Sequence, residues 1–178
     1  MPQRHRISLL PCNFIAPNHR TAFVNLLLAY MTDPMGGCAP HTEQTAQQVI
    51  ESLRNHPTAY IQFAMYRRKI VGMAVCFVNY STFQASPFIN IHDLIVLPQF
   101  RKTGIGEALI HGVTLKAMSL QCAKVTLEVR DDNHVAKTLY RKMGFCSCTP
   151  MMEYLNKKIA VPPQESLPNP IAHKVSKM

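Results

Sequence analysis

Two glycines and two basic residues lie close together near the middle of the chain. The segment Arg101-Lys102-Thr103-Gly104-Ile105-Gly106-Glu107 follows an apolar run that ends at Leu97. Glycine lacks a Cβ atom, so backbone N–H groups beside it can approach an oxyanion closely. If a helix begins here, its first N–H groups add partial positive charge, and Arg101 and Lys102 add full charges. The spacing predicts a phosphate-binding loop, with an ordinary strand-to-helix turn as the alternative.

Two common nucleotide-binding motifs do not fit this loop. A dinucleotide fingerprint needs a third glycine where the chain has Leu109. A Walker loop needs Gly-Lys-Ser/Thr where the chain has Gly106-Glu107-Ala108. The sequence therefore indicates neither of these nucleotide-binding classes.

A second segment, from Asn133 to Phe145, carries further polar and aromatic groups at regular spacing. The first segment, Arg101-x-x-Gly104-x-Gly106, resembles the pyrophosphate loop of the GCN5-related N-acetyltransferases (GNAT family). The second, N-x-x-A-x-x-L-Y-x-x-x-G-F, resembles that family's other signature. The two motifs occur in the expected order between about Asp93 and Phe145, and the predicted element order extends the resemblance over roughly residues 5 to 158.

The resemblance implies that acetyl-CoA is held between two splayed parallel strands, Phe88 to Leu97 and Lys124 to Val129. The backbone of Leu94, Ile95 and Val96 would pair with the pantetheine arm, and Asn133 would bond to its side. The pyrophosphate would be held by the loop residues Arg101, Lys102, Thr103, Gly104, Ile105, Gly106 and Glu107. Family loops often carry glycine at the position of Lys102, so the chain departs from the pattern there.

The implied reaction needs a proton donor for the departing thiolate and a base for the attacking amine. The resemblance places the Tyr140 hydroxyl near the thioester sulfur, and a phenol of pKa ~10 stays protonated at neutral pH. His92 and Asp93 lie on the strand beside the expected thioester and are candidate bases, with a water chain as the alternative. No metal is implied.

The acceptor pocket is expected between the two front helices and the loops near them. Asp33, Met35, Tyr80 and Phe83 lie in these loops and suggest a small or medium amine beside apolar and aromatic groups. The chain carries 19 Lys and Arg against 10 Asp and Glu, a net charge of +9, which disfavours a polycationic acceptor. A small molecule is therefore expected rather than a protein substrate, and a homodimer remains an option.

Apolar periodicity places these motifs on one mixed sheet. Strand-like runs are Ile7–Leu10, Ala59–Tyr66, Ile70–Tyr80, Phe88–Leu97, Lys124–Val129 and Met151–Ile159. Helical spacing begins at a cap on Asn18, at Thr42, at Ile105 and at Asn133. The order β-α-α-β-β-β-α-β-α-β gives an α+β, mixed α/β class, and the resemblance implies six to seven strands with about four helices.

Composition limits the class of protein further. With 178 residues, 47% of them hydrophobic, the chain suits a single globular domain, expected over residues 5–159, with a Pro-rich flexible tail over 160–178. The six cysteines form no C-x-x-C pair, and no run is apolar enough for a signal peptide or a membrane span. These features predict a cytoplasmic protein with reduced thiols and no membrane partner.

Two other functions remain open at this stage. A non-catalytic CoA-binding or regulatory protein would share the same fold, but Tyr140 and the His92-Asp93 pair favour an enzyme. A basic nucleic-acid-binding module would suit the net charge of +9, but the chain has no recognisable reading motif, and no nucleic-acid partner is expected.

Overall fold

The computed structural model describes residues 7–36 and 39–159. The chain divides into two compact units, Met1–Phe145 and Cys146–Met178. The helices and strands of the described residues all lie in the first unit. The Pro-rich tail predicted over 160–178 lies outside the described residues, and the domain boundary expected after residue 159 stays a prediction.

The element order follows the predicted one up to the last helix. The elements are β1 (Ser8–Pro11), α1 (Pro17–Met31), α2 (Glu43–Arg54), β2 (Ala59–Tyr66), β3 (Lys69–Ser81), β4 (Ser86–Val96), the 3-10 helix η1 (Pro98–Phe100), α3 (Ile105–Ser119), β5 (Val125–Leu127) and α4 (His134–Lys142).

The helix starts show which local signals are decisive. The Thr42 hydroxyl accepts a hydrogen bond from the Thr45 N–H at 3.2 Å, which confirms Thr42 as the N-cap of α2. The predicted Asn18 cap of α1 is wrong, because that helix begins at Pro17 with Ala16 as N-cap. Proline has a preset φ and no N–H to lose, so it suits the first helical position.

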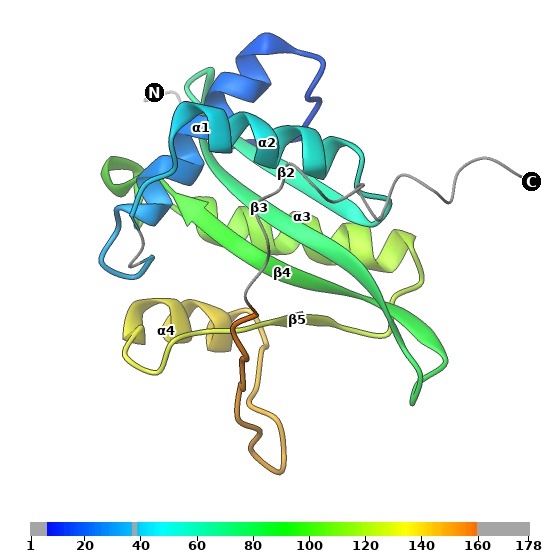
Figure 1. Ribbon diagram of the computed structural model, residues 1–178. Coiled ribbons are helices and arrows are strands. Elements are labelled where there is room, and N and C mark those ends of the chain that lie inside the picture. Colours follow the sequence, from blue (N-terminus) through cyan, green and yellow to red (C-terminus); the bar gives the residue numbers. More distant parts are fainter. Residues whose placement is uncertain (1–6, 37–38, 160–178) are drawn as a thin grey trace, which may run out of the picture. The chain divides into compact units, whose positions relative to one another are not determined.

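The sheet has five strands in the order β1-β2-β3-β4-β5, antiparallel except for the parallel pair β4 and β5 (Figure 1). The hairpin predicted around Arg67 and Arg68 is confirmed, with φ values of 49° and 63° at its two turn residues. Positive φ at both central positions is the geometry that matches the twist of a two-residue hairpin.

Over the residues that the structure describes, the sheet has five strands and not the expected six to seven. No strand is assigned between residues 146 and 159, so the predicted strand Met151–Ile159 is wrong. A half-buried strand needs apolar and polar residues in alternation. That alternation is broken by the adjacent Met151 and Met152 and by the polar run Asn156-Lys157-Lys158. Pro150 also lacks the N–H that a strand ladder uses.

The sheet carries a hydrophobic core on each face, with α1 and α2 on one side and α3 on the other (Figure 1). The α3 side buries Ile105, Leu109, Val113, Ala117, Ala64, Val71, Ala74, Cys76, Ile89 and Ile91. The α1 and α2 side buries Phe14, Phe23, Leu26, Ile50, Ile61, Phe63, Met73, Val75 and Ile95. Cores on both faces hold β3 and β4 rigidly, so β4 can serve as a fixed edge for a site.

Candidate active site

A β-bulge in β4 sets the geometry of the candidate site. Val75 of β3 pairs with Asp93, but its neighbour Cys76 pairs with Ile91, so His92 is the extra residue. An extra residue bends its strand and increases the local twist. The parallel pairing of β4 with β5 ends at the same level, at Ile91 and Leu127. Beyond this level the two strands no longer pair.

A cavity of about 150 Å³ lies where the two strands separate. It is lined by Tyr30, Met35, Ile91, His92, Leu94, Leu127, Glu128, Val129, Arg130, Asn133, Ala136 and Tyr140. Five residues that the sequence analysis selected therefore come together here: Met35, His92, Leu94, Asn133 and Tyr140. They come from three separate parts of the chain: the loop after α1, β4, and α4 with its N-cap.

The edge of β4 beside this cavity has no paired strand after Ile91 among the described residues of the first unit. Leu97 donates its N–H to Val71 on β3, and backbone groups alternate between the two edges of a strand. Leu94 and Val96 therefore direct their N–H and C=O groups to the open edge, while Ile95 faces β3. This edge can accept an added strand, as the pantetheine prediction requires.

The loop of residues 101–107, called the phosphate loop below, presents backbone donors at the start of α3. Gly104 is the N-cap with φ 86° and has no side chain to cap the helix. The N–H groups of Ile105, Gly106 and Glu107 begin the helix, and no earlier helical carbonyl reaches them. The loop thus fits a pyrophosphate group by its donor set.

Other contacts explain the residue types around this loop. A Cβ atom on Gly106 would lie 3.0 Å from Leu139 Cδ2, so this glycine allows α3 to pack closely on α4. Lys142 on α4 pairs with Glu107 at 2.5 Å, which partly neutralises the one carboxylate of the loop. The Thr103 hydroxyl donates to the Phe100 carbonyl at 2.6 Å.

The Arg101 side chain has partners within the protein. Its Nη2 lies 2.6 Å from Asp33 Oδ2, and its Nε donates to the Val96 carbonyl at 3.1 Å. Burial acts to raise the pKa of Asp33, but hydrogen bonds from Arg101 and the Met35 N–H, with the Arg101 charge, hold that pKa below its usual value. Asp33 does not line the cavity, whereas Met35 does.

Tyr140 projects into the cavity from α4. Burial, and to a lesser degree the nearby Tyr30, raises the pKa of the Tyr140 phenol to about 12. A phenol with this pKa stays protonated at every physiological pH and can donate a proton. Its ring also packs edge-on against Phe145, with 5.9 Å between ring centroids, which fixes its direction.

The two candidate bases have different surroundings. His92 is exposed in the cavity wall and packs edge-on against Phe77 at 5.6 Å. Asp93 is half-buried beside it and is not a lining residue. Burial raises the pKa of Asp93, and the charge of His92 opposes this shift only partly. The geometry therefore favours His92 over Asp93 as the group that meets a ligand.

Glu128 lies in the cavity wall and was missed by the sequence analysis. It follows β5 and accepts hydrogen bonds from Asn90 Nδ2 at 3.2 Å to each carboxylate oxygen. Thr126 lies in β5 and Glu128 follows two residues later, so extended backbone directs both side chains to the same face. Asn90 of β4 pairs with Thr126. That spacing was visible in the sequence, but only the parallel pairing of β4 and β5 brings Glu128 to the same cavity as His92.

Asn133 has a structural task besides the predicted one. Its Oδ1 accepts a hydrogen bond from the Ala136 N–H at 3.1 Å and so caps α4. The Asn133 amide group Nδ2 remains as the donor for a ligand. Asn133 can therefore fix α4 and contact the cavity at the same time.

Tyr80 and Phe83 lie at the far end of the β3–β4 hairpin and do not line the cavity. The two residues are 63% and 101% exposed. Their predicted contact with the acceptor stays a prediction that this cavity does not support.

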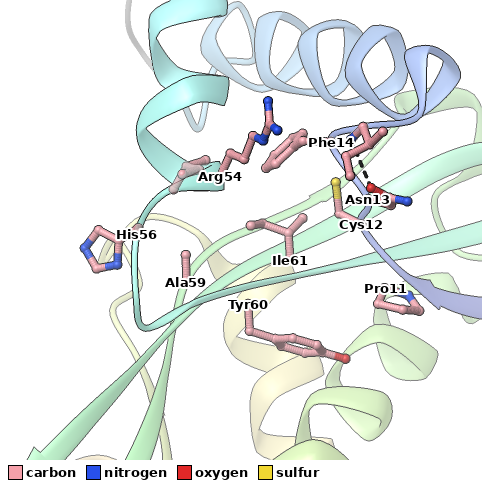
Figure 2. Close-up of a pocket in the computed structure, with 11 residues that line it drawn as sticks. Pro11, Cys12, Asn13, Phe14, Arg54, His56, Ala59, Tyr60 and Ile61 are labelled. Carbon is pink, nitrogen blue, oxygen red and sulfur yellow. Dashed lines mark hydrogen bonds between the residues drawn. The ribbon is translucent and has the colours of Figure 1, made fainter. Parts of the chain in front are cut away.

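A second cavity, of about 320 Å³, lies between the β1–α1 connection, the end of α2 and the start of β2 (Figure 2). Cys12, Phe14 and Ile61 form its apolar part, and burial raises the pKa of the Cys12 thiol to about 12. Tyr60 lies on the other side of the strands from Phe14 and donates to Gln62 at 2.7 Å (Figure 2). This cavity contains no residue of either motif.

Two other kinds of feature are absent from the described residues. Residues 7–36 and 39–159 contain no group of three or more His, Cys, Asp or Glu side chains placed to hold a metal ion. In the same residues no helix has both the length and the apolar character needed to cross a bilayer.

Comparison with known proteins gives curated relatives that are N-acetyltransferases. The chain is 33% identical over 75 residues to a thialysine N-epsilon-acetyltransferase of Bos taurus, a match that covers 42% of this chain and 44% of that protein. It is 23% identical over 122 residues to an aminoglycoside N(6')-acetyltransferase type 1 of Acinetobacter baumannii, covering 67% and 80%. The chain thus spans less than half the length of the cattle relative.

Solved structures share the fold. A ribosomal-protein-alanine N-acetyltransferase from Brucella melitensis biovar Abortus 2308 has a TM-score of 0.72 at 16% identity, covering 86% of this chain and 100% of that chain. The aminoglycoside N-acetyltransferase AAC(6')-Iy in complex with CoA has a TM-score of 0.67 at 17% identity, covering 92% and 99%. At these identities the likeness shows the fold alone.

The sequence also matches a family model described as "Acetyltransferase (GNAT) family" over residues 22–145. This stretch includes both motifs, the bulge of β4 and the cavity-lining part of α4. The resemblance predicted from the phosphate loop and the Asn133–Phe145 signature is therefore confirmed. The chain belongs to the GNAT acetyltransferase family.

Proposed function

We propose that the protein is an acetyl-CoA-dependent N-acetyltransferase that acts on a primary amine in a ternary complex. The observation that carries this proposal is the convergence of Tyr140, His92 and the open edge of β4 on one cavity. A protonated phenol can give a proton to a departing thiolate, an imidazole can accept a proton from an amine, and an unpaired strand edge can bind an extended ligand. The named relatives catalyse transfers of this class.

The protein groups have separate tasks in binding acetyl-CoA. The backbone N–H groups at the start of α3 and the Lys102 charge hold the pyrophosphate. The open edge of β4, through Leu94 and Val96, pairs with the pantetheine arm, and Asn133 Nδ2 donates to its other side. These contacts bring the thioester to the widened space beside His92.

In the reaction the amine nitrogen forms a C–N bond to the thioester carbonyl carbon, and the C–S bond breaks. The ammonium loses one proton to solvent to become the neutral nucleophile, and His92 takes the second proton as the amide forms, directly or through water, with Asp93 as the weaker candidate. Tyr140 gives its proton to the departing thiolate sulfur. The proton taken by His92 can later restore the Tyr140 phenol through solvent. Glu128 attracts the incoming ammonium group electrostatically before its proton is lost.

We propose a small amine as the acceptor rather than a protein. Among the twelve lining residues Glu128 is the one carboxylate, and Arg130 forms a bidentate pair with Asp132 at 2.9 and 2.8 Å. One carboxylate suits an acceptor with a single ammonium group near apolar surface, here from Tyr30 and Met35. A cytoplasmic location and a homodimer stay predictions.

Thermal unfolding with and without acetyl-CoA tests the first step. A ligand at one hundred times its Kd stabilises the folded state by ~2.7 kcal/mol, which raises Tm by roughly 5 to 10 °C in a domain of this size. Adenine alone should give no such rise. No rise at millimolar acetyl-CoA would overturn the proposal.

Thiol release in the presence of chosen amines tests the reaction. The panel is thialysine, the aminoglycoside kanamycin, and a short peptide with an N-terminal alanine. We expect turnover with thialysine and a lower kcat/KM with polycationic kanamycin. Preferred acetylation of the peptide would overturn the small-molecule assignment, and CoA binding without turnover of any amine would favour a non-catalytic CoA-binding protein.

A further inference from the structure

Arg101 lies where three parts of the proposed site meet. It is the first residue of the phosphate loop, its Nε donates to the Val96 carbonyl on the open edge of β4, and its Nη2 pairs with Asp33. The guanidinium group is therefore engaged inside the protein on two sides. Two of its five N–H donors are used in these bonds, which hold the side chain in one direction.

Asp33 organises the short loop that follows α1. Its N–H donates to the Tyr30 carbonyl at 3.0 Å, its carbonyl accepts from the Gly36 N–H at 2.8 Å, and its Oδ1 accepts from the Met35 N–H at 2.9 Å. Tyr30 and Met35 both line the cavity. The Asp33 side chain is only 9% exposed, so its position is well defined by these contacts.

We infer that Arg101 is a positioning residue that couples the phosphate loop to the loop after α1, through its pair with Asp33. Binding of a pyrophosphate to the backbone of residues 102–107 restrains the start of the loop and with it the Arg101 backbone. The Arg101 guanidinium group then has fewer accessible conformations, and the Asp33 carboxylate bonded to it becomes more restrained as well. Tyr30 and Met35 are set in place on the acceptor side of the cavity.

This inference changes the role that the motif predicts for the two cations of the loop. Lys102, at φ 60° and exposed, forms no ion pair with the described residues 7–36 and 39–159 and is the side-chain cation available to phosphate. Arg101 acts on the protein instead. The two neighbouring residues thus form a matched pair, in which loss of either removes one positive charge from the same loop.

Hydrogen exchange of the backbone amides with and without CoA tests the coupling, and it needs no acceptor amine. The Met35 and Gly36 N–H groups, both bonded to Asp33, are the reporters. In the wild-type protein we expect saturating CoA to slow their exchange at least severalfold. In Arg101→Gln and in Asp33→Asn this CoA-dependent protection should be lost, although each variant is saturated with CoA according to its own measured Kd.

Lys102→Gln is the control for charge. It should weaken CoA binding by several-fold in a salt-dependent way but keep the protection of Met35 and Gly36 once CoA is saturating. Asp33→Asn keeps both loop cations, so its CoA Kd should change less than twofold while the protection is lost. Melting curves check that each variant is folded. If Arg101→Gln does not fold, the isosteric variant Asp33→Asn alone tests the coupling.

The inference rests on the proposed function only in taking CoA as the ligand. Undiminished protection in both Arg101→Gln and Asp33→Asn would overturn it, as would a wild-type loop that does not respond to bound CoA. A larger loss of CoA affinity in Arg101→Gln than in Lys102→Gln, with protection retained, would make Arg101 a phosphate ligand after all. Absence of turnover with CoA-dependent protection would overturn the proposed reaction and support the coupling.

If an amine is turned over, the kinetic constants give a second readout. Arg101→Gln and Asp33→Asn should each raise the KM for the amine about fivefold or more with a smaller change in the KM for acetyl-CoA. The double variant should be no worse than the more affected single variant, because both changes remove the same contact.

Discussion

Replacement of Gly104 by alanine tests whether the start of α3 is a ligand-binding loop or an ordinary turn. Gly104 has φ 86° and ψ 0°, in the left-handed region that L-residues disfavour. A Cβ atom there would meet nothing closer than Ile7 Cδ1 at 3.9 Å, which is an ordinary contact. The substitution therefore adds backbone strain without a steric clash.

The expected size of the effect follows from this geometry. A left-handed conformation costs an L-residue roughly 1 to 2 kcal/mol. For a domain of this length the loss corresponds to a decrease in Tm of roughly 3 to 8 °C. Relief of the strain also turns the N–H groups of Ile105, Gly106 and Glu107 away from their present direction. Loss of one hydrogen bond to a charged phosphate costs about 1.5 to 3 kcal/mol, or at least tenfold in Kd.

Gly144 provides a matched control for the strain. It has φ 89°, a Cβ atom there would meet nothing within 4 Å, and its N–H already donates to the Arg141 carbonyl at 3.0 Å. Gly144→Ala should lower Tm by a similar amount. Calorimetric titration with CoA should show a Kd near that of the wild type for Gly144→Ala and a weakened Kd for Gly104→Ala. Equal CoA affinities in the two variants would refute the assignment of the loop.

Three further variants test other parts of the site and fold. Tyr140→Phe should lower kcat by roughly 10² to 10⁴-fold with little change in CoA Kd, because only the proton donor is lost. Burial raises the pKa of Tyr140 to about 12, so wild-type turnover measured by thiol release should show no decline from this group up to pH 10. Asp93→Asn should raise Tm at pH 7, because the raised pKa of Asp93 means that its ionised form disfavours the folded state. The gain in Tm should vanish as the pH falls below the pKa of an ordinary aspartate. An unchanged or lower Tm at pH 7 would contradict this sign. Arg67→Asn with Arg68→Gly should raise Tm by a few degrees at unchanged CoA affinity, because asparagine and glycine adopt the φ values of 49° and 63° more readily; a lower Tm would count against the turn geometry.

The elements that could be predicted are those whose signals are local. The Thr42 cap, the Arg67-Arg68 hairpin and the Asn133 start of α4 each depend on hydrogen bonds and backbone angles within a few residues. The turn at Gly104 and the helix start at Ile105 belong to the same group, because both are local properties, while the binding of phosphate there stays a prediction. These segments also carry the two family motifs, so the sequence alone determined the family and the expected cofactor.

The predictions that failed required information from outside the segment. The strand predicted over Met151–Ile159 was suggested by apolar composition, but no partner strand is paired with it, and Pro150 with the polar run after Leu155 weakens the pattern. Asn18 is a good cap by residue type, yet Pro17 fits the first helical position and shifts the start. Local preference alone could not decide between these competing signals.

Only the tertiary structure decided the composition of the cavity and the partners of the Arg101 side chain. His92 becomes a cavity residue because the register between β3 and β4 leaves it unpaired, and Glu128 joins it because β5 pairs with β4 in one particular register. Asp33 and Arg101 are 68 residues apart, and their pairing depends on how α1 packs across the sheet. Sequence spacing encodes contacts within a turn of helix or a hairpin, whereas contacts between distant segments are fixed by the packing of the two cores.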